Sequence, residues 1–101
     1  MSYPKIVKSR DLELFRKELE LVGGSMRKLS RSRMIVGDPS QMPVVYRRTR
    51  KKWLLVGDLC SMYPDYYVWL DTHTHTYSWG RVAVDYKMVT PPHVISVKIK
   101  I

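Results

Sequence analysis

Nine basic side chains, gathered in two clusters, are the residues of this sequence best suited to bind a polyanion. Residues 26–52 contain these nine bases and a single acid, whereas residues 1–25 hold five bases and four acids, and residues 53–101 hold four of each. Six of the nine are arginines, whose planar guanidinium group suits bidentate contact with phosphate. A charge excess confined to one part of the chain indicates a polyanionic partner; the alternative is a solvated, charge-rich pair of loops. The nine bases are Arg27, Lys28, Arg31, Arg33, Arg47, Arg48, Arg50, Lys51 and Lys52.

A second group of residues could contact nucleobases or sugars, because aromatic and basic side chains alternate along one segment. On a continuous strand over residues 77–87, Tyr77, Trp79 and Arg81 project from one face. Aromatic rings stack on bases and arginine neutralises phosphate, as in proteins that bind single strands. Tyr77 and Trp79 have an alternative role as core residues, which is the more common fate of large aromatic side chains.

Two histidines form a pattern that is typical of a metal site. Asp71, His73 and His75 share one face of an extended segment, and His-x-His is a spacing that zinc sites use. Zinc requires further ligands, which Cys60 or His93 could supply only through the fold. A polar hairpin loop around the histidines is the simpler interpretation. Because nothing identifies a nucleophile with an orienting partner, we predict no catalytic residue, metal or cofactor.

These side chains need a scaffold, and its first predicted element is an amphipathic helix over residues 10–22. Ser9 is a suitable N-cap, and Gly23 with Gly24 is a suitable stop. We expect the apolar stripe of this helix to pack against a core or a sheet, and a partner-binding helix is the alternative. The stripe recurs at helical spacing and consists of Leu12, Phe15, Leu19 and Val22, widened by Leu14 and Leu21.

Beyond Gly24 the pattern changes to short runs of β-branched and aromatic residues separated by Gly, Pro and Asp, which predicts strands. The C-terminal run alternates apolar and polar residues, as a half-buried strand does. The predicted strands are residues 34–36, 44–48, 53–57, 66–70, 77–86 and 94–101.

One N-terminal helix followed by five or six mostly antiparallel strands predicts an α+β fold. We expect a single domain over residues 1–101, with the helix at about 10–22 and a β-rich region at about 34–101. The strands are expected to form a small SH3-like barrel or a curved sheet packed on the helix.

A short echo inside the strand region marks two turns. Ile35-Val36-Gly37-Asp38 recurs as Leu55-Val56-Gly57-Asp58, 20 residues later, and a Met and a Pro follow each copy. A strand that ends in Gly-Asp, followed by a Pro before the next strand, is typical of a hairpin or a long-looped strand pair. We interpret both aspartates as turn residues rather than as acid or metal groups.

Two segments resemble known families over short stretches. Trp53, Val56-Gly57-Asp58, Cys60 and then residues 65–69 resemble the opening of an SH3-like barrel of the Tudor kind, over less than a fifth of the chain. The tripeptide Trp79-Gly80-Arg81 resembles the core of WGR domains, which are associated with nucleic-acid ends. The residues that follow each segment depart from the family pattern, so neither family is recognised.

The expected location is intracellular: cytoplasm, nucleus or virion. The apolar runs are too short for a transmembrane helix, and residues 1–5 lack the apolar stretch of a secretory signal. The single Cys60 cannot form an internal disulfide and suits a reducing compartment.

These patterns predict a small, basic, non-enzymatic nucleic-acid-binding protein that prefers RNA or single-stranded DNA. The two basic clusters would bind phosphates, while Tyr77, Trp79 and Arg81 would contact bases or sugars. The one clear helix is acidic, so reading of the major groove by that helix is disfavoured. A first alternative is a viral or phage-type regulatory protein whose basic surface binds an acidic site on a partner protein. A second is a small toxin-type endoribonuclease that uses arginine with histidine or tyrosine as acid and base.

Overall fold

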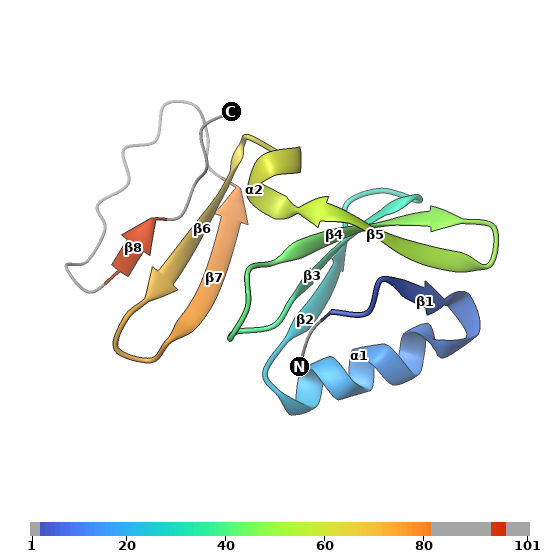
Figure 1. Cartoon of the computed structure of the whole chain (residues 1–101), viewed down its shortest axis with the longest axis horizontal. Helices are drawn as coiled ribbons and strands as arrows, with labels where there is room; N and C mark the ends of the chain where they lie inside the picture. The colour runs from blue at the N-terminus through green and yellow to red at the C-terminus, as the bar shows by residue number, and fades with distance from the viewer. Residues whose placement is uncertain (1–2, 82–93, 97–101) are drawn as a thin grey trace.

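The computed structural model describes residues 3–81 and 94–96. Over these residues the chain forms one long helix near the N-terminus and eight strands in two antiparallel sheets (Figure 1). This arrangement confirms the predicted α+β class. The larger sheet is curled and packs on the helix, which is one of the two arrangements that the sequence predicts.

The larger sheet holds five strands in the order β1-β5-β4-β3-β2, with every neighbouring pair antiparallel. Residues 29–32 connect β2 to β3, and Arg50 with Lys51 connects β4 to β5. A β-bulge next to Val45 shifts the β4–β5 register and adds to the curl. The strands are β1 (Ile6–Lys8), β2 (Ser25–Lys28), β3 (Arg33–Gly37), β4 (Val44–Thr49) and β5 (Lys52–Asp58).

The C-terminus of the helix lies where the sequence predicts it, just before Gly23 and Gly24. At its start the prediction is wrong by two residues: a 3-10 turn, η1 (Ser9–Asp11), leads into α1 (Leu12–Leu21), so Asp11 and not Ser9 occupies the N-cap position. The amides of Gly23 and Gly24 donate to the carbonyl oxygens of Glu20 and Leu19 at 3.1 and 2.7 Å. Gly23 has a φ of 80°, a conformation that glycine adopts without steric strain, so this residue stops the helix.

The apolar stripe of α1 packs against the larger sheet. Phe15 and Leu19 are buried, and the Phe15 ring meets the Tyr46 ring edge-on with centroids 6.0 Å apart. Leu14 and Leu21 are 59% and 86% exposed, so they lie outside this contact. The buried residues on this side, named the helix-side core, are Val7, Phe15, Leu19, Met34, Val36, Val44, Tyr46 and Trp53.

A second core lies on the opposite face of the larger sheet. The short helix α2 (Leu59–Met62) directs the chain into a smaller sheet, in which β6 (Tyr66–Asp71) lies between β7 (Thr76–Arg81) and β8 (Val94–Ser96). Ile35 belongs to this second core because side chains alternate along β3 between the two faces. The buried residues, named the sheet-side core, are Ile35, Val45, Leu59, Cys60, Tyr66 and Val68.

The structure extends and corrects the predicted elements. The predicted strands at 34–36, 44–48, 53–57 and 66–70 match β3 to β6 within two residues at each end. Two strands, β1 and β2, were not predicted, because β1 has only three residues and β2 is largely polar. The β-rich region therefore begins at Ser25, not at residue 34. The predicted strand at 77–86 coincides with β7 up to Arg81, and the one at 94–101 with β8 up to Ser96; the remaining residues of both lie outside the described ranges.

The first Gly-Asp pair is a turn, as predicted. The Asp38 carboxylate is buried and accepts hydrogen bonds from the backbone N–H and hydroxyl of Ser40 at 2.9 and 2.8 Å. It also accepts one from the Gln41 side chain at 3.0 Å. Burial by itself raises the pKa of the Asp38 carboxyl, but these hydrogen bonds favour the ionised form and hold the pKa below its usual value. Asp38 is thus a structural group.

The second Gly-Asp pair behaves differently. Asp58 immediately precedes α2, and the next strand, β6, pairs with β7 and β8 rather than returning along β5. The prediction of a hairpin-like pair is therefore right for the first copy and wrong for the second, because one helical turn carries the chain away from the sheet.

Candidate nucleic-acid interface

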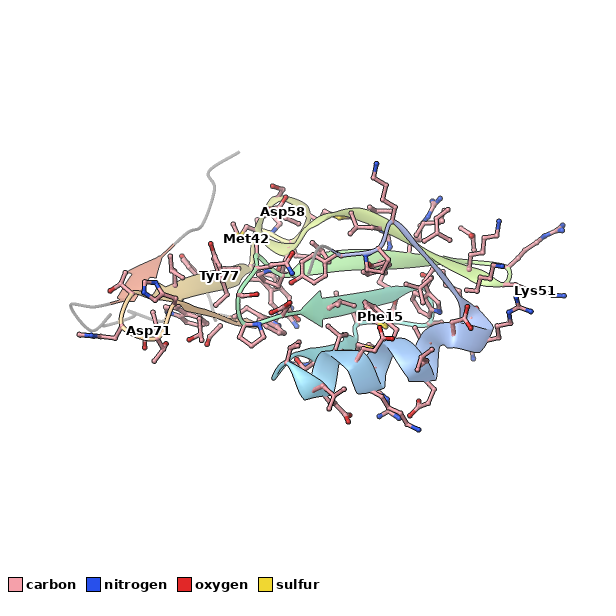
Figure 2. All side chains as sticks on the ribbon, turned by 60° about the horizontal axis from the view of Figure 1, so that its bottom comes forward. Phe15, Met42, Lys51, Asp58, Asp71 and Tyr77 are labelled. Atoms are coloured by element: carbon pink, nitrogen blue, oxygen red, sulfur yellow. The ribbon has the colours of Figure 1, made fainter. Side chains whose placement is uncertain are left out.

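The two basic clusters meet at one end of the larger sheet. Arg33 and Arg47 lie directly opposite each other on β3 and β4, and the amide of Arg48 donates to the carbonyl oxygen of Ser32 at 2.8 Å. The β2–β3 and β4–β5 turns therefore lie side by side. Lys51 marks this end of the molecule, away from the smaller sheet with Asp71 (Figures 1 and 2).

Two bases that the sequence pattern did not single out complete this surface. Lys8 lies opposite Lys52 on β1 and β5, and the amide of Ser9 donates to the carbonyl oxygen of Lys51 at 2.8 Å. Arg10 lines the same pocket as these residues. We name the combined surface the basic end, and it comprises Lys8, Arg10, Lys28, Arg31, Arg33, Arg47, Arg48, Arg50, Lys51 and Lys52.

The bases of this surface face solvent without acidic partners. All are exposed except Arg33, which is partly buried. Among residues 3–81 and 94–96, the ion pairs are Arg16 with Glu13 at 2.5 Å and Arg81 with Asp65 at 2.8 Å, so no base of the basic end is neutralised by a described acid.

The strand register places like charges directly opposite one another. The hydrogen bond from Arg48 to Ser32 flanks the pair of Arg33 and Arg47, and this pattern identifies a non-hydrogen-bonded pair, in which side chains approach most closely. The bond from Ser9 to Lys51 gives the pair of Lys8 and Lys52 the same geometry. Like charges in such pairs destabilise a sheet, and a bound polyanion removes that repulsion.

Arginines also occupy an uncovered half of one sheet face. Arg33 and Arg47 alternate with helix-side core residues along their strands, so their side chains point to the face opposite α1. Arg27 points to the same face, but it pairs with Ile35 and is the one predicted base of the two clusters that lies outside the basic end. On the same face, Ile35 and Val45 are buried in the sheet-side core. The smaller sheet and α2 therefore cover one half of the face and leave the arginine half open.

The aromatic candidates lie elsewhere. The Trp79 ring packs directly on Gly37, where a Cβ atom would come within 1.9 Å of it. Tyr77 also packs against the sheet-side core, and its amide donates to the carbonyl oxygen of Pro39 at 2.5 Å. Gly37 and Arg33 are at opposite ends of β3, about 13 Å apart at 3.3 Å per residue. The structure therefore does not place Tyr77 and Trp79 on the surface that gathers the bases.

Arg81 is likewise separate from the basic end. Its side chain is 73% exposed and pairs with Asp65 at 2.8 Å. Unlike the bases of the basic end, Arg81 therefore has an acidic partner among the described residues.

The histidine pattern forms a polar hairpin turn. The Asp71 carboxylate accepts hydrogen bonds from the amides of His73 and Thr74 at 2.9 and 3.4 Å. In the described part of the chain no three His, Cys, Asp or Glu side chains gather as metal ligands would. This turn belongs to the smaller sheet, away from the basic end (Figure 1).

Arg50 occupies a backbone position that favours glycine. Its φ is 40°, in the first position of the two-residue β4–β5 turn, where an L side chain is strained by about 1–2 kcal/mol. We expect Arg50→Gly to stabilise the fold by about 0.5–1 kcal/mol, after the greater flexibility of glycine in the unfolded chain is subtracted. The same substitution should weaken oligonucleotide binding, because a base of the basic end is lost. Urea unfolding and a binding titration measure the two effects.

His75 provides the matched control for Arg50. It has a φ of 55° in the β6–β7 turn, so His75→Gly should also stabilise the fold, but without any change in binding. Equal loss of affinity in both variants would show that turn flexibility, not the Arg50 charge, affects binding.

Comparison with known proteins adds no relative: no family model, curated protein or solved structure matches this chain. None of the helices in the described ranges is long and apolar enough to cross a membrane.

Proposed function

We propose that this protein binds single-stranded nucleic acid, RNA or DNA, through the phosphate backbone and without catalysis. The observation that carries this proposal is the basic end, where two hairpin turns and the β1–η1 junction bring ten bases together with no described acid paired to them. Phosphate contacts of this kind dominate the affinity of nucleic-acid-binding proteins.

The shape of the surface supports a single strand rather than a duplex read by a helix. The bases lie on hairpin turns and on the open half of a sheet face, whereas α1 is rich in acids, including Glu13 and Glu18. An open sheet face leaves the planar guanidinium groups of Arg33 and Arg47 free to stack on unpaired bases. Because Tyr77 and Trp79 pack against the core, we expect little sequence preference.

A salt titration tests this function. About four to six neutralised phosphates predict that log K falls with log salt at a slope of about −3 to −4 for a mixed-sequence single strand. Fluorescence anisotropy of a labelled oligonucleotide measures the slope, and the duplex of the same sequence is the comparison. Tighter binding of the duplex would contradict the single-strand preference.

A pull-down from lysate tests the alternative partner. If the captured partner is nucleic acid, it disappears after nuclease treatment. Retention of an acidic protein after digestion, together with no oligonucleotide binding at low salt, would overturn the proposed function.

A further inference from the structure

We propose that the outer edge of β1 binds an extended acidic peptide of a partner protein, which adds to the larger sheet as a sixth strand. This site goes beyond the proposed nucleic-acid interface. It uses the backbone of β1 and the outer side of α1, and it shares only Lys8 and Lys52 with the basic end.

The backbone of β1 offers the hydrogen-bonding groups for strand addition. The amide of Leu55 donates to the carbonyl oxygen of Lys5 at 2.9 Å, and the amide of Ser9 donates to that of Lys51 at 2.8 Å. These bonds make Ile6 and Lys8 the non-hydrogen-bonded residues of the β1–β5 ladder, so their N–H and C=O groups point away from β5. Since β1 is the edge strand of its sheet, an added strand can pair with those groups.

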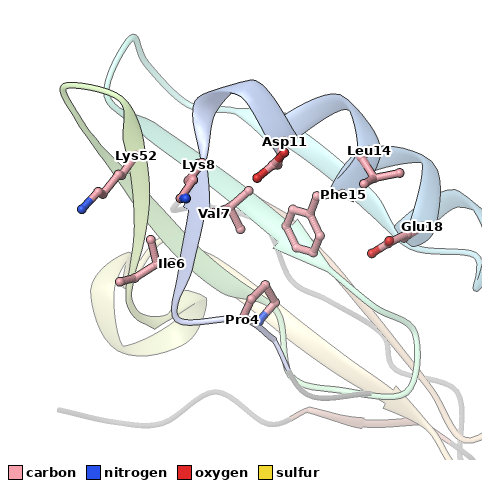
Figure 3. Close-up of a pocket in the computed structure, with 9 residues that line it drawn as sticks. All are labelled: Pro4, Ile6, Val7, Lys8, Asp11, Leu14, Phe15, Glu18 and Lys52. Carbon is pink, nitrogen blue, oxygen red and sulfur yellow. The ribbon is translucent and has the colours of Figure 1, made fainter.

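A groove lies beside this edge. Figure 3 shows β1 and α1 as its two walls, with Val7 and Phe15 between them. Its volume is about 530 Å³. On the helix wall Leu14 is 59% exposed beside the buried ring of Phe15, whereas Ile6, 54% exposed, points with Lys8 to the sheet face away from α1. The groove therefore suits a ligand with apolar side chains on one face.

The charges of the groove define the ligand further. Lys8 and Lys52 lie opposite each other and point to the sheet face away from α1. The opposite wall, formed by η1 and α1, carries Leu14 and Phe15 together with two acids, Asp11 and Glu18 (Figure 3). These two carboxylates repel acidic residues of a ligand from the helix side, so its acids are confined to the side of the lysines. Successive side chains of an added strand point alternately to these two sides. Acidic residues would meet the lysines and remove their mutual repulsion, while the apolar residues between them would meet Leu14 and Phe15. The expected ligand thus alternates acidic and apolar residues.

Charge also argues against a second copy of this chain at the same edge. Antiparallel pairing of two β1 strands about Val7 would make Lys8 of each copy a diagonal neighbour of the other, within about 7–8 Å. Each chain carries a net charge of +9, so the two copies repel each other. A short edge strand that carries a lysine is also a feature by which proteins avoid self-pairing.

The test uses a synthetic peptide, Glu-Val-Glu-Val-Glu-Val with blocked ends, titrated into the full chain labelled with ¹⁵N. We expect binding to shift the amide signals of Ile6 and Lys8 and to slow their hydrogen exchange. A peptide of the same composition without alternation, Glu-Glu-Glu-Val-Val-Val, is expected to bind at least tenfold more weakly.

Two variants separate the edge from general charge. Ile6→Pro removes a backbone N–H donor that points away from β5, so it leaves the β1–β5 ladder intact. It should weaken peptide binding about tenfold, which is the effect of one or two lost hydrogen bonds. Leu14→Lys should weaken it similarly, whereas Leu21→Lys on the same helix, outside the groove, should not.

Distinct outcomes would overturn the inference. The first is equal binding of the peptide by wild type and by Ile6→Pro. The second is a dimer in solution that Ile6→Pro dissociates. The third is protection of the Ile6 and Lys8 amides from hydrogen exchange already in the free protein. Failure of the nucleic-acid proposal gives a different result, because Arg47→Gln, Arg48→Gln and Arg50→Gln together leave the groove intact and should retain peptide binding.

Discussion

Trp79→Ala is expected to lower the free energy of unfolding by about 3 kcal/mol, the lower part of the range for a large buried aromatic side chain. The lower part applies because the ring is partly exposed. The ring fills the space above the Gly37 backbone and packs against the sheet-side core, so its removal leaves a cavity between the two sheets. The folded variant should bind single strands as wild type does. Urea unfolding followed by circular dichroism, and a binding titration under folding conditions, measure the two quantities.

Gly37→Ala gives this prediction a control from the other side of the contact. In the wild-type background the added Cβ would lie within 1.9 Å of the Trp79 ring, so the substitution should be strongly destabilising. In the Trp79→Ala background the same Cβ enters the vacated space, and the destabilisation should largely disappear. A double-mutant cycle measures this coupling. If Trp79→Ala instead unfolds like wild type but loses affinity about 5- to 150-fold, Trp79 stacks on nucleobases and the packing argument is wrong.

The joint replacement of Arg47, Arg48 and Arg50 by Gln is expected to weaken binding of a single strand about 100-fold at 0.1 M salt. Loss of three phosphate contacts lowers the magnitude of the slope of log K against log salt by about 2. A change of about 2 in this slope corresponds to about 100-fold in affinity over a tenfold change in salt concentration. The melting temperature should stay the same or rise, because removal of the Arg47 charge relieves the repulsion with Arg33. Anisotropy titrations at several salt concentrations and a thermal melt test both statements.

A second triple variant controls for net charge. Lys5, Arg16 and Lys17 are exposed bases outside the basic end, and their replacement by Gln removes the same total charge. Affinity should fall by less than about threefold, since no clustered phosphate contact is lost. Equal weakening by both triples would show that affinity depends on overall charge and not on the meeting of the two hairpin turns.

The sequence predicted those elements whose signals are local. The stop of α1 at Gly23 follows from a backbone conformation that glycine favours, and β3 to β6 follow from runs of β-branched and aromatic residues. In contrast, β1 has only three residues and β2 is largely polar, and they are strands because β5 and β3 supply partners for their backbone groups. The pairing of β1 with β5 joins residues 44 to 48 positions apart and therefore has no signal in a short window of sequence.

The residues of the candidate site also divide into those with a local sequence signal and those brought there by strand pairing. The nine bases could be identified in the sequence because they lie in two dense clusters. Lys8 and Arg10 lie instead in a segment whose bases are balanced by acids. Only the pairing of β1 with β5 brings Lys8 to the basic end. Alternation correctly placed Tyr77 and Trp79 on one face of a strand. It could not determine which face would be covered, because that depends on how the smaller sheet packs on Gly37.

The separation of the two cores along the chain also has a consequence for the order in which they can form during synthesis. Every residue of the helix-side core lies between Val7 and Trp53, so that core is complete before α2 is made. The sheet-side core takes Ile35 and Val45 from the larger sheet but needs Tyr66 and Val68 from the smaller one. A nascent chain can therefore fold α1 and the five-stranded sheet first, as the surface on which the later strands assemble.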